Sequence, residues 1–160
     1  MGSLRVAGFQ GFLPVHQLAG SPTLIPNERG VYVWVRDSRA EPEFLEVDTG
    51  GHFKGRNPNV PIDELRSNWV AGSAVVYIGK AGDPDSSSTL RQRLGQYLKF
   101  GAGAAVGHWG GRYVWQLADS SDLLIAWLPL PDGFPSAVES ELIDQFRAQF
   151  GERPFANLAK

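Results

Sequence analysis

One stretch, from Val75 to Gly95, constrains this chain more than any other part of it. It begins with β-branched and aromatic residues, Val75 to Ile78, a composition typical of a buried strand. Gly79 ends this run, and Lys80 opens a loop rich in Gly, Asp, Pro and Ser, the residue types that favour turns. The stretch therefore predicts a strand that brings a tyrosine and a lysine to the start of a loop.

A helix is expected directly after this loop. Ser88 or Thr89 would be its N-cap, because a side-chain oxygen there can accept a hydrogen bond from a free backbone N–H. Three leucines recur at the helical period and form its apolar stripe: Leu90, Leu94 and Leu98. Arg93 and Tyr97 are four residues apart, so they share one face of the helix. One short unit thus brings two tyrosines, a lysine and an arginine near each other.

Two further strands and one helix complete the expected core. Gly30–Val35 is rich in β-branched and aromatic residues after a turn signal, and Leu123–Leu128 is a continuous apolar run of strand length. A last helix is expected near 137–150, after an N-cap at Ser136. We therefore predict a small α/β (α+β) fold, with a mixed, mainly antiparallel three-stranded central sheet flanked by this helix and the one near 89–100.

The segments outside this core carry weaker signals. Residues 1–29 are interpreted as an irregular entry that packs against the sheet, because Gly8, Gly11 and Pro14 interrupt any strand. Residues 112–117 fit a strand or a helix equally well.

Residues 36–74 form a long segment between two of the expected strands. It contains a possible strand, Phe44–Val47, and a short helix, Pro61–Trp69, with proline in its first turn. Its glycine- and asparagine-rich middle carries Lys54 and Arg56. Long loops inside compact domains are often functional. The segment is therefore interpreted either as a flap that contacts a substrate or as an edge excursion without such a role.

Length and composition narrow the class of protein. The chain has 160 residues, of which 42% are hydrophobic, as suits one domain spanning residues 1–160. No apolar run approaches the ~18–20 residues of a membrane span, and the N-terminus lacks the apolar core of a signal peptide. The absence of cysteine excludes disulfides, thiol nucleophiles and Cys-ligated zinc. We therefore expect a cytoplasmic protein without a membrane partner.

The charge of the chain is slightly negative overall but unevenly distributed. A formal net charge of -2 argues against a protein that coats nucleic acid nonspecifically. Residues 86–118 nevertheless contain no Asp or Glu, and they include four basic residues: Arg91, Arg93, Lys99 and Arg112. A local positive patch on a mildly acidic body is compatible with a phosphodiester substrate.

Three short motifs, in this order along the chain, resemble the core of the GIY-YIG endonuclease superfamily. Gly30–Tyr32 (GVY) is similar to the first half-motif, with Val in place of Ile, and Tyr77–Gly79 (YIG) matches the second. The helix that follows carries an essential arginine in the superfamily, and Arg93 stands there in this chain. The resemblance covers residues 30–157. The insertion 36–74 departs from it, because the simplest members have a tight hairpin between the half-motifs.

The resemblance continues in the last helix and beyond it. In the superfamily, a glutamate early in a C-terminal helix binds a divalent metal, and a Pro-x-x-Asn segment supplies an asparagine. Glu139 and Asn157 stand at these positions, with Glu141 as the alternative register for the glutamate. Glu139 also has a competing role, since Ser136 and Glu139 have the spacing of a capping box.

The resemblance implies a catalytic role for six residues: Tyr32, Tyr77, Arg93, Tyr97, Glu139 and Asn157. Glu139 would bind Mg²⁺ or Mn²⁺, and Arg93 would donate to the non-bridging oxygens of the phosphate. Tyr32, deprotonated or relayed through Tyr77, would take the proton of the attacking water. A free tyrosine has a pKa of about 10, so nearby cations would have to favour the phenolate.

Four basic residues are expected to bind substrate: Lys80, Arg91, His108 and Arg112. His108 lies in the glycine-rich stretch 101–111 and is also compatible with a structural hydrogen-bonding role.

The implied function is a divalent-metal-dependent endonuclease that hydrolyses phosphodiester bonds, with DNA as the favoured substrate. The alternatives are a catalytically silent nucleic-acid-binding module and a defence or toxin nuclease that acts with a partner. Only three residues follow Asn157, so we expect no appended DNA-binding domain. Specificity would then come from the domain's own loops, a homo-oligomer or another protein.

Overall fold

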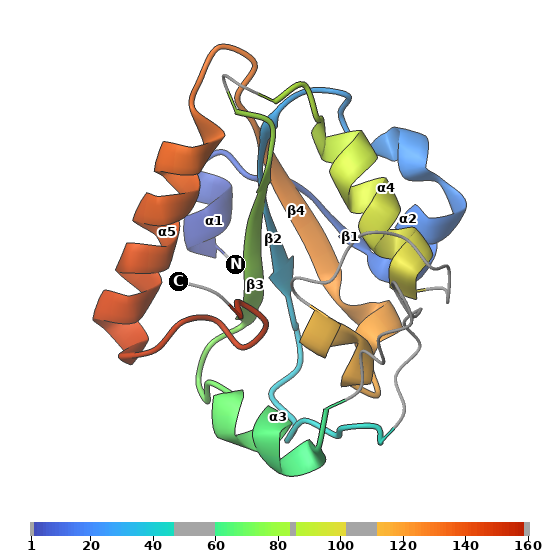
Figure 1. Ribbon diagram of the computed structural model, residues 1–160, viewed down its shortest axis with the longest axis vertical. Coiled ribbons are helices and arrows are strands. Elements are labelled where there is room, and N and C mark those ends of the chain that lie inside the picture. The colour runs from blue at the N-terminus through green and yellow to red at the C-terminus, as the bar shows by residue number, and fades with distance from the viewer. Residues whose placement is uncertain (1, 47–59, 84–85, 102–111, 159–160) are drawn as a thin grey trace.

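A four-stranded antiparallel sheet with helices on both faces forms the framework of the protein (Figure 1). A computed structural model describes residues 2–46, 60–83, 86–101 and 112–158. The strands are β1 (Gln10–Pro14), β2 (Gly30–Val35), β3 (Val75–Ala81) and β4 (Leu124–Pro129). They lie in the order β1-β4-β2-β3, and each neighbouring pair is antiparallel. The small α/β fold is as predicted, but the sheet has four strands rather than three and has no parallel pair.

The additional strand, β1, lies in the segment that we predicted to be irregular. Gly11 and Pro14 were expected to interrupt any strand there, and that expectation is wrong. Strand β1 pairs only with β4, at an edge of the sheet, and Pro14 is its last residue, a position where proline is tolerated. The register shifts between Gly11 and Leu13, where Phe12 has a φ of 55°. Helices α1 (Gly2–Val6) and α2 (Val15–Gly20) flank the strand.

Alternating residues of β2 separate the core into two layers. Val31, Val33 and Val35 belong to an apolar cluster with residues of α5 (Pro135–Phe150). Tyr32 and Trp34 belong to the other cluster, with residues of α2 and of α4 (Leu90–Gly101). Helices α5 and α4 therefore pack against opposite faces of the sheet (Figure 1). Successive strand residues point to opposite faces, so one six-residue strand supplies both layers.

The start of α4 is fixed by a reciprocal pair of hydrogen bonds. The Gln92 N–H donates to the Thr89 hydroxyl oxygen over 3.2 Å, and the Thr89 N–H donates to the Gln92 side-chain oxygen over 3.1 Å. This is a capping box, in which each residue satisfies a free N–H of the first turn. Of the two predicted N-caps, Thr89 therefore has this role, while the Ser88 hydroxyl accepts from the Gly82 N–H.

The two described ends of the insertion are fastened to a short 3₁₀ helix, η2 (Arg112–Gln116). The Gln116 side chain donates to the carbonyl oxygens of Leu45 and Val60 and accepts from the Val60 N–H. Helix α3 (Ile62–Asn68) forms where a helix was predicted. The predicted strand at Phe44 is only an isolated bridge to Leu117.

Two further 3₁₀ turns, η1 (Pro22–Leu24) and η3 (Ser120–Asp122), complete the elements. Lys54 and Arg56 of the predicted flap lie outside the described residues, as does His108. No helix in the described part of the chain is both long and apolar enough to cross a bilayer.

Candidate active site

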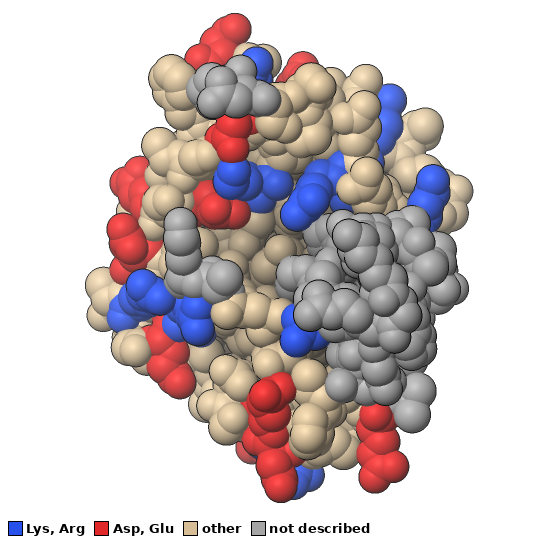
Figure 2. Space-filling model, in the orientation of Figure 1, with Lys and Arg blue, Asp and Glu red and all other residues tan. Residues whose placement is uncertain are grey.

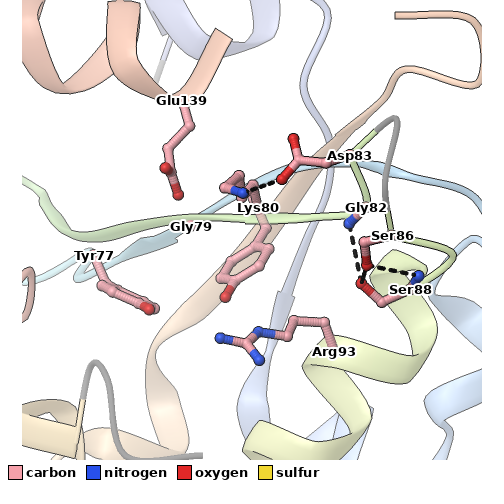
Figure 3. Close-up of a pocket in the computed structure, with 10 residues that line it drawn as sticks. Tyr77, Gly79, Lys80, Gly82, Asp83, Ser86, Ser88, Arg93 and Glu139 are labelled. Atoms are coloured by element: carbon pink, nitrogen blue, oxygen red, sulfur yellow. Dashed lines mark hydrogen bonds and ion pairs between the residues drawn. The ribbon is translucent and has the colours of Figure 1, made fainter. Parts of the chain in front are cut away.

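A polar pocket of about 280 Å³ opens beside β3, an edge strand, between the helices that cover the two faces of the sheet. Its lining comes from β2, β3, the loop after β3, α4 and α5. The lining residues are Tyr32, Tyr77, Gly79, Lys80, Gly82, Asp83, Ser86, Ser88, Arg93 and Glu139. Figure 3 shows Arg93 and Glu139 reaching toward this pocket from different helices. Five residues predicted for the site thus line one pocket, although they span positions 32 to 139 of the sequence.

The glycine of the YIG tripeptide allows the Tyr32 ring to reach this pocket. Tyr32 is the register partner of Gly79, and a Cβ on Gly79 would overlap the ring and hydroxyl of Tyr32. Any other residue at this position would push the ring away from β3. Tyr77 lies two residues earlier in the strand, with its ring centroid 6.0 Å from that of Tyr32. The strand register and the lack of a side chain at Gly79 together allow both phenols to line the pocket.

The two phenols lie close enough to each other and to Arg93 to change one another's protonation. The charge of Arg93 and hydrogen bonding with Tyr77 and Arg93 each lower the pKa of Tyr32. Burial raises the pKa of Tyr32, because the phenolate loses hydration, and the positive charge of Arg93 only partly opposes this effect. Burial raises the pKa of Tyr77 further, and the bond that it donates to Tyr32 adds to the rise. Arg93 favours the phenolate form of both residues, as expected, but burial raises both pKa values by more than Arg93 lowers them.

Glu139 comes from the second turn of α5. The helix begins at Pro135, and its N-cap is Phe134 rather than the predicted Ser136. The Ser136 hydroxyl lies inside the helix and donates to the Asp83 carboxylate. The predicted capping box between Ser136 and Glu139 is therefore wrong, because it requires Ser136 to be the N-cap. The negative charge of Glu139 contributes to raising the pKa values of Tyr32 and Tyr77, so it lies within electrostatic reach of both phenols.

Lys80 and Asp83 form an ion pair on the rim of the pocket (Figure 3). Lys80 belongs to β3, which continues to Ala81, and not to the loop where it was predicted. The pKa of the Asp83 carboxyl lies below its usual value, because Lys80 and then Ser136 donate hydrogen bonds to it. The sequence analysis did not identify Asp83. Its position three residues after Lys80, in a turn-forming segment, is the signal that could have indicated the pair.

Tyr97 and Asn157 lie outside this pocket. Tyr97 is fully buried, and its ring centroid lies 4.6 Å from that of Trp34 and 5.6 Å from that of Tyr77, one layer behind the pocket wall. The Asn157 side chain accepts from the N–H of Ile78 and donates to the carbonyl oxygen of the same residue. Asn157 therefore fastens the C-terminal segment to β3 between Tyr77 and Gly79, which suits a residue that positions its neighbours.

Arg91 and Arg112, which were predicted to bind substrate, also lie outside this pocket. Arg91 donates to the carbonyl oxygens of Ile25 and Thr23, so its guanidinium holds α4 against the segment before β2. Arg112 lies over the Tyr113 ring, with its guanidinium carbon 5.6 Å from the ring centroid, and it does not line the pocket. Helical periodicity was enough to predict that Arg93 faces the site. The carbonyl oxygens that bind Arg91 are more than 60 residues away in the sequence, and no local pattern indicates them.

The donor set of the pocket fits magnesium better than zinc. In the described part of the chain, no three His, Cys, Asp or Glu side chains are grouped as a metal site would require. Structural and catalytic zinc sites use three or four such ligands. Magnesium is commonly held by one or two carboxylates, with waters and substrate phosphates completing its coordination. Glu139 lines the pocket and would be the single protein carboxylate in such a site, because Asp83 is held by Lys80 and Ser136.

Comparisons with protein-family models, with curated proteins and with solved structures found no match to this chain.

Proposed function

We propose that the protein is a divalent-metal-dependent endonuclease that hydrolyses phosphodiester bonds in nucleic acid, with DNA as the favoured substrate. The resemblance to the GIY-YIG superfamily implies this activity. The observation that carries the proposal is the shared pocket: two phenols, a guanidinium, an ammonium and a carboxylate from separate parts of the chain line it together. The alternative is that these charged side chains only stabilise the fold. That alternative does not account for the two phenols in the pocket, or for the glycine that leaves room for the Tyr32 ring.

In this proposal Arg93 binds the scissile phosphate. Its planar guanidinium can donate two parallel hydrogen bonds to the non-bridging oxygens, and it keeps its charge at every relevant pH. Charge builds up on these oxygens when water attacks, so a fixed donor there stabilises the transition state. Lys80, paired with Asp83 in the substrate-free protein, supplies a second positive charge on the rim.

Tyr32 is proposed to accept the proton of the attacking water. Its raised pKa means that only a small fraction is phenolate at neutral pH, while that fraction is a strong base. The hydrogen bonds from Tyr77 and Arg93 stabilise this minor form. The reaction should therefore become faster as the pH rises, because each unit below the pKa of Tyr32 reduces the phenolate fraction tenfold.

Glu139 is proposed to hold Mg²⁺ or Mn²⁺. A bound cation would neutralise the phosphate and stabilise the leaving 3'-oxygen. The carboxylate lines the same pocket as the two phenols and Arg93, so a metal ion would lie near the phosphate and the water.

Cleavage of supercoiled plasmid in the presence of Mg²⁺ tests the proposal. The wild-type protein should nick or linearise the plasmid, and Glu139→Gln should abolish this activity. Glu141→Gln is the matched control, because Glu141 is an exposed carboxylate on the same helix that does not line the pocket. Equal activity of the three proteins would refute the proposed metal ligand. An inactive wild-type protein that still shifts DNA in a gel would favour the silent binding module instead.

A further inference from the structure

A second concave pocket lies where the chain turns back at the end of α5. Gly151 ends the helix with a φ of 77°, in the left-handed region, and the residues after it run back to the edge of β3. The Ala156 N–H donates to the carbonyl oxygen of Val76, which fixes this return. The residues that line the pocket come from the last turn of α5, from the segment after it and from α3: Asn68, Arg147, Gly151, Glu152, Arg153, Pro154 and Asn157.

Two guanidinium groups line this pocket, and no ion pair of either is found among the described residues. Arg147 is exposed and Arg153 is half-buried, and neither forms an ion pair within 4.0 Å with an acid in the described part of the chain. Arg36 and Lys80, by contrast, are both paired with aspartates. Glu152 lies in the same pocket and offsets one of the two positive charges. The arrangement leaves guanidinium donors available to an anion from outside the protein.

This pocket and the candidate active site are connected through Asn157. Asn157 lines the second pocket and hydrogen-bonds to Ile78, which lies between two residues of the active-site wall, Tyr77 and Gly79. On α5, Glu139 and Arg147 are eight residues apart, which corresponds to about 12 Å along the helix axis. Figure 2 shows basic side chains over the C-terminal end of α5, on the same face as those beside β3.

We infer that this second pocket, which we call the α5-end pocket, binds another phosphate of the nucleic-acid strand whose scissile phosphate lies at Arg93. The inference rests on the proposed function. Each strand of a duplex carries one phosphate per about 3.4 Å of helix axis, so a strand whose scissile phosphate lies at Arg93 carries further phosphates within reach of the second pocket. Arginine forks in a concave pocket suit a phosphate, and contacts of this kind fix the register of a strand without reading its sequence.

Salt-dependent DNA binding tests the inference. Fluorescence anisotropy with a labelled duplex, in EDTA and in the Glu139→Gln background, measures the affinity without cleavage. Replacing Arg147 and Arg153 together by Gln should weaken binding on the order of tenfold at 100 mM salt and reduce the slope of log K against log salt by about 1.8. The matched control replaces Arg5 and Arg39, two exposed arginines that line neither pocket, and should change the slope less. Equal slopes for the two double variants would overturn the inference.

Glu152→Gln should have the opposite effect on DNA affinity. Removing the negative charge from the α5-end pocket should tighten binding, and the gain should disappear when Arg147 and Arg153 are replaced as well. Unchanged or weaker binding by Glu152→Gln would count against a phosphate in this pocket. Plasmid cleavage by the wild type is scored separately. Cleavage without the slope change refutes only the α5-end pocket, whereas the slope change without cleavage refutes only the endonuclease.

Discussion

The aromatic layer beneath α4 has a core end and a pocket end. At the core end, Tyr97 packs between Trp34 and Trp115, with ring centroids 4.6 Å and 5.5 Å away. At the pocket end, the ring centroids of Tyr32 and Tyr77 lie 6.0 Å apart, and the charge of Arg93 lowers the pKa of both phenols. The fraction exposed to solvent does not separate the two ends, because Tyr32 is 1% and Tyr97 0% exposed.

The difference between the two ends lies in what the side chains border. Burial raises the pKa of the phenols at both ends, so a perturbed pKa alone does not identify a catalytic tyrosine here. Tyr32 and Tyr77 line a pocket with Arg93 and Glu139, whereas Tyr97 is enclosed by other rings. We propose that the pocket end carries the chemistry and that the core end serves packing, and each prediction below tests this division.

The largest expected effect separates Tyr32 from Tyr97. Tyr32→Phe should lower kcat/KM by about 10²–10⁴, the usual contribution of a general base. Tyr97→Phe removes the same hydroxyl from the core end and should reduce activity less than about tenfold. Nuclease rates between pH 6 and 9.5 provide a second measurement. The wild-type rate should rise with pH, and Tyr32→Phe should flatten the profile. A Tyr97→Phe protein as inactive as Tyr32→Phe would contradict the division.

A somewhat smaller effect separates two arginines of α4. Arg93→Gln should lower kcat by about 10²–10³, as expected for the loss of one donor to the transition state, while the protein stays folded. Arg91→Gln should leave kcat nearly unchanged and lower the free energy of unfolding by about 1–2 kcal/mol, because it removes hydrogen bonds to two carbonyl oxygens. Urea unfolding and steady-state kinetics of both variants measure this difference. The opposite pattern would show that Arg91, not Arg93, contacts the substrate.

Removing the Asn157 side chain should lower both the stability of the fold and kcat. Asn157→Ala leaves the N–H and carbonyl of Ile78 without their partner at the sheet edge, at a cost of about 1–3 kcal/mol in the free energy of unfolding. Because Ile78 lies between two residues of the pocket wall, kcat should also fall, while the salt dependence of DNA binding should stay close to that of the wild type. Thermal unfolding and kinetics test this. If Asn157→Ala is as stable as the wild type, Asn157 does not position the edge of β3.

The smallest expected effect is spectroscopic. The chain has four tyrosines, and burial raises the pKa of every one of them. A raised folded-state pKa means that the stabilisation is complete below the unfolded value of about 10 and is lost as the pH rises further. Absorbance at 295 nm should therefore show little phenolate at pH 10 and then rise together with unfolding. Titration of one tyrosine near pH 10 in the folded protein would contradict the burial of that side chain.

The sequence predicted the parts of the fold that local patterns encode. The strand–loop–helix unit around Tyr77 and Arg93 is present, because β-branched composition and leucine periodicity act over short distances. Strand β1 was missed because its proline is tolerated at an edge but not in a central strand, and edge position is a property of the whole sheet. The prediction of a Ser136 capping box was wrong for a similar reason, because the Ser136 hydroxyl donates to the carboxylate of Asp83, which is distant in the sequence.

The candidate site could be predicted only in part. The motif positions of Tyr32, Tyr77, Lys80, Arg93 and Glu139 identified side chains that do line one pocket. Tyr97 and Arg91 share the helix of Arg93, yet packing and distant carbonyl oxygens determine where they point. Asp83 and the α5-end pocket depend on contacts between segments far apart in the chain, which no local pattern contains.

The position of a bound metal and phosphate tests the central claim most directly. We would crystallise the Tyr32→Phe protein with Mn²⁺ and a short DNA duplex, and locate the manganese by its anomalous scattering. We predict one peak about 2.1–2.2 Å from a Glu139 carboxylate oxygen, with a DNA phosphate between the metal and the Arg93 guanidinium. Manganese bound away from Glu139, or a duplex that crosses the protein without placing a phosphate at Arg93, would contradict it.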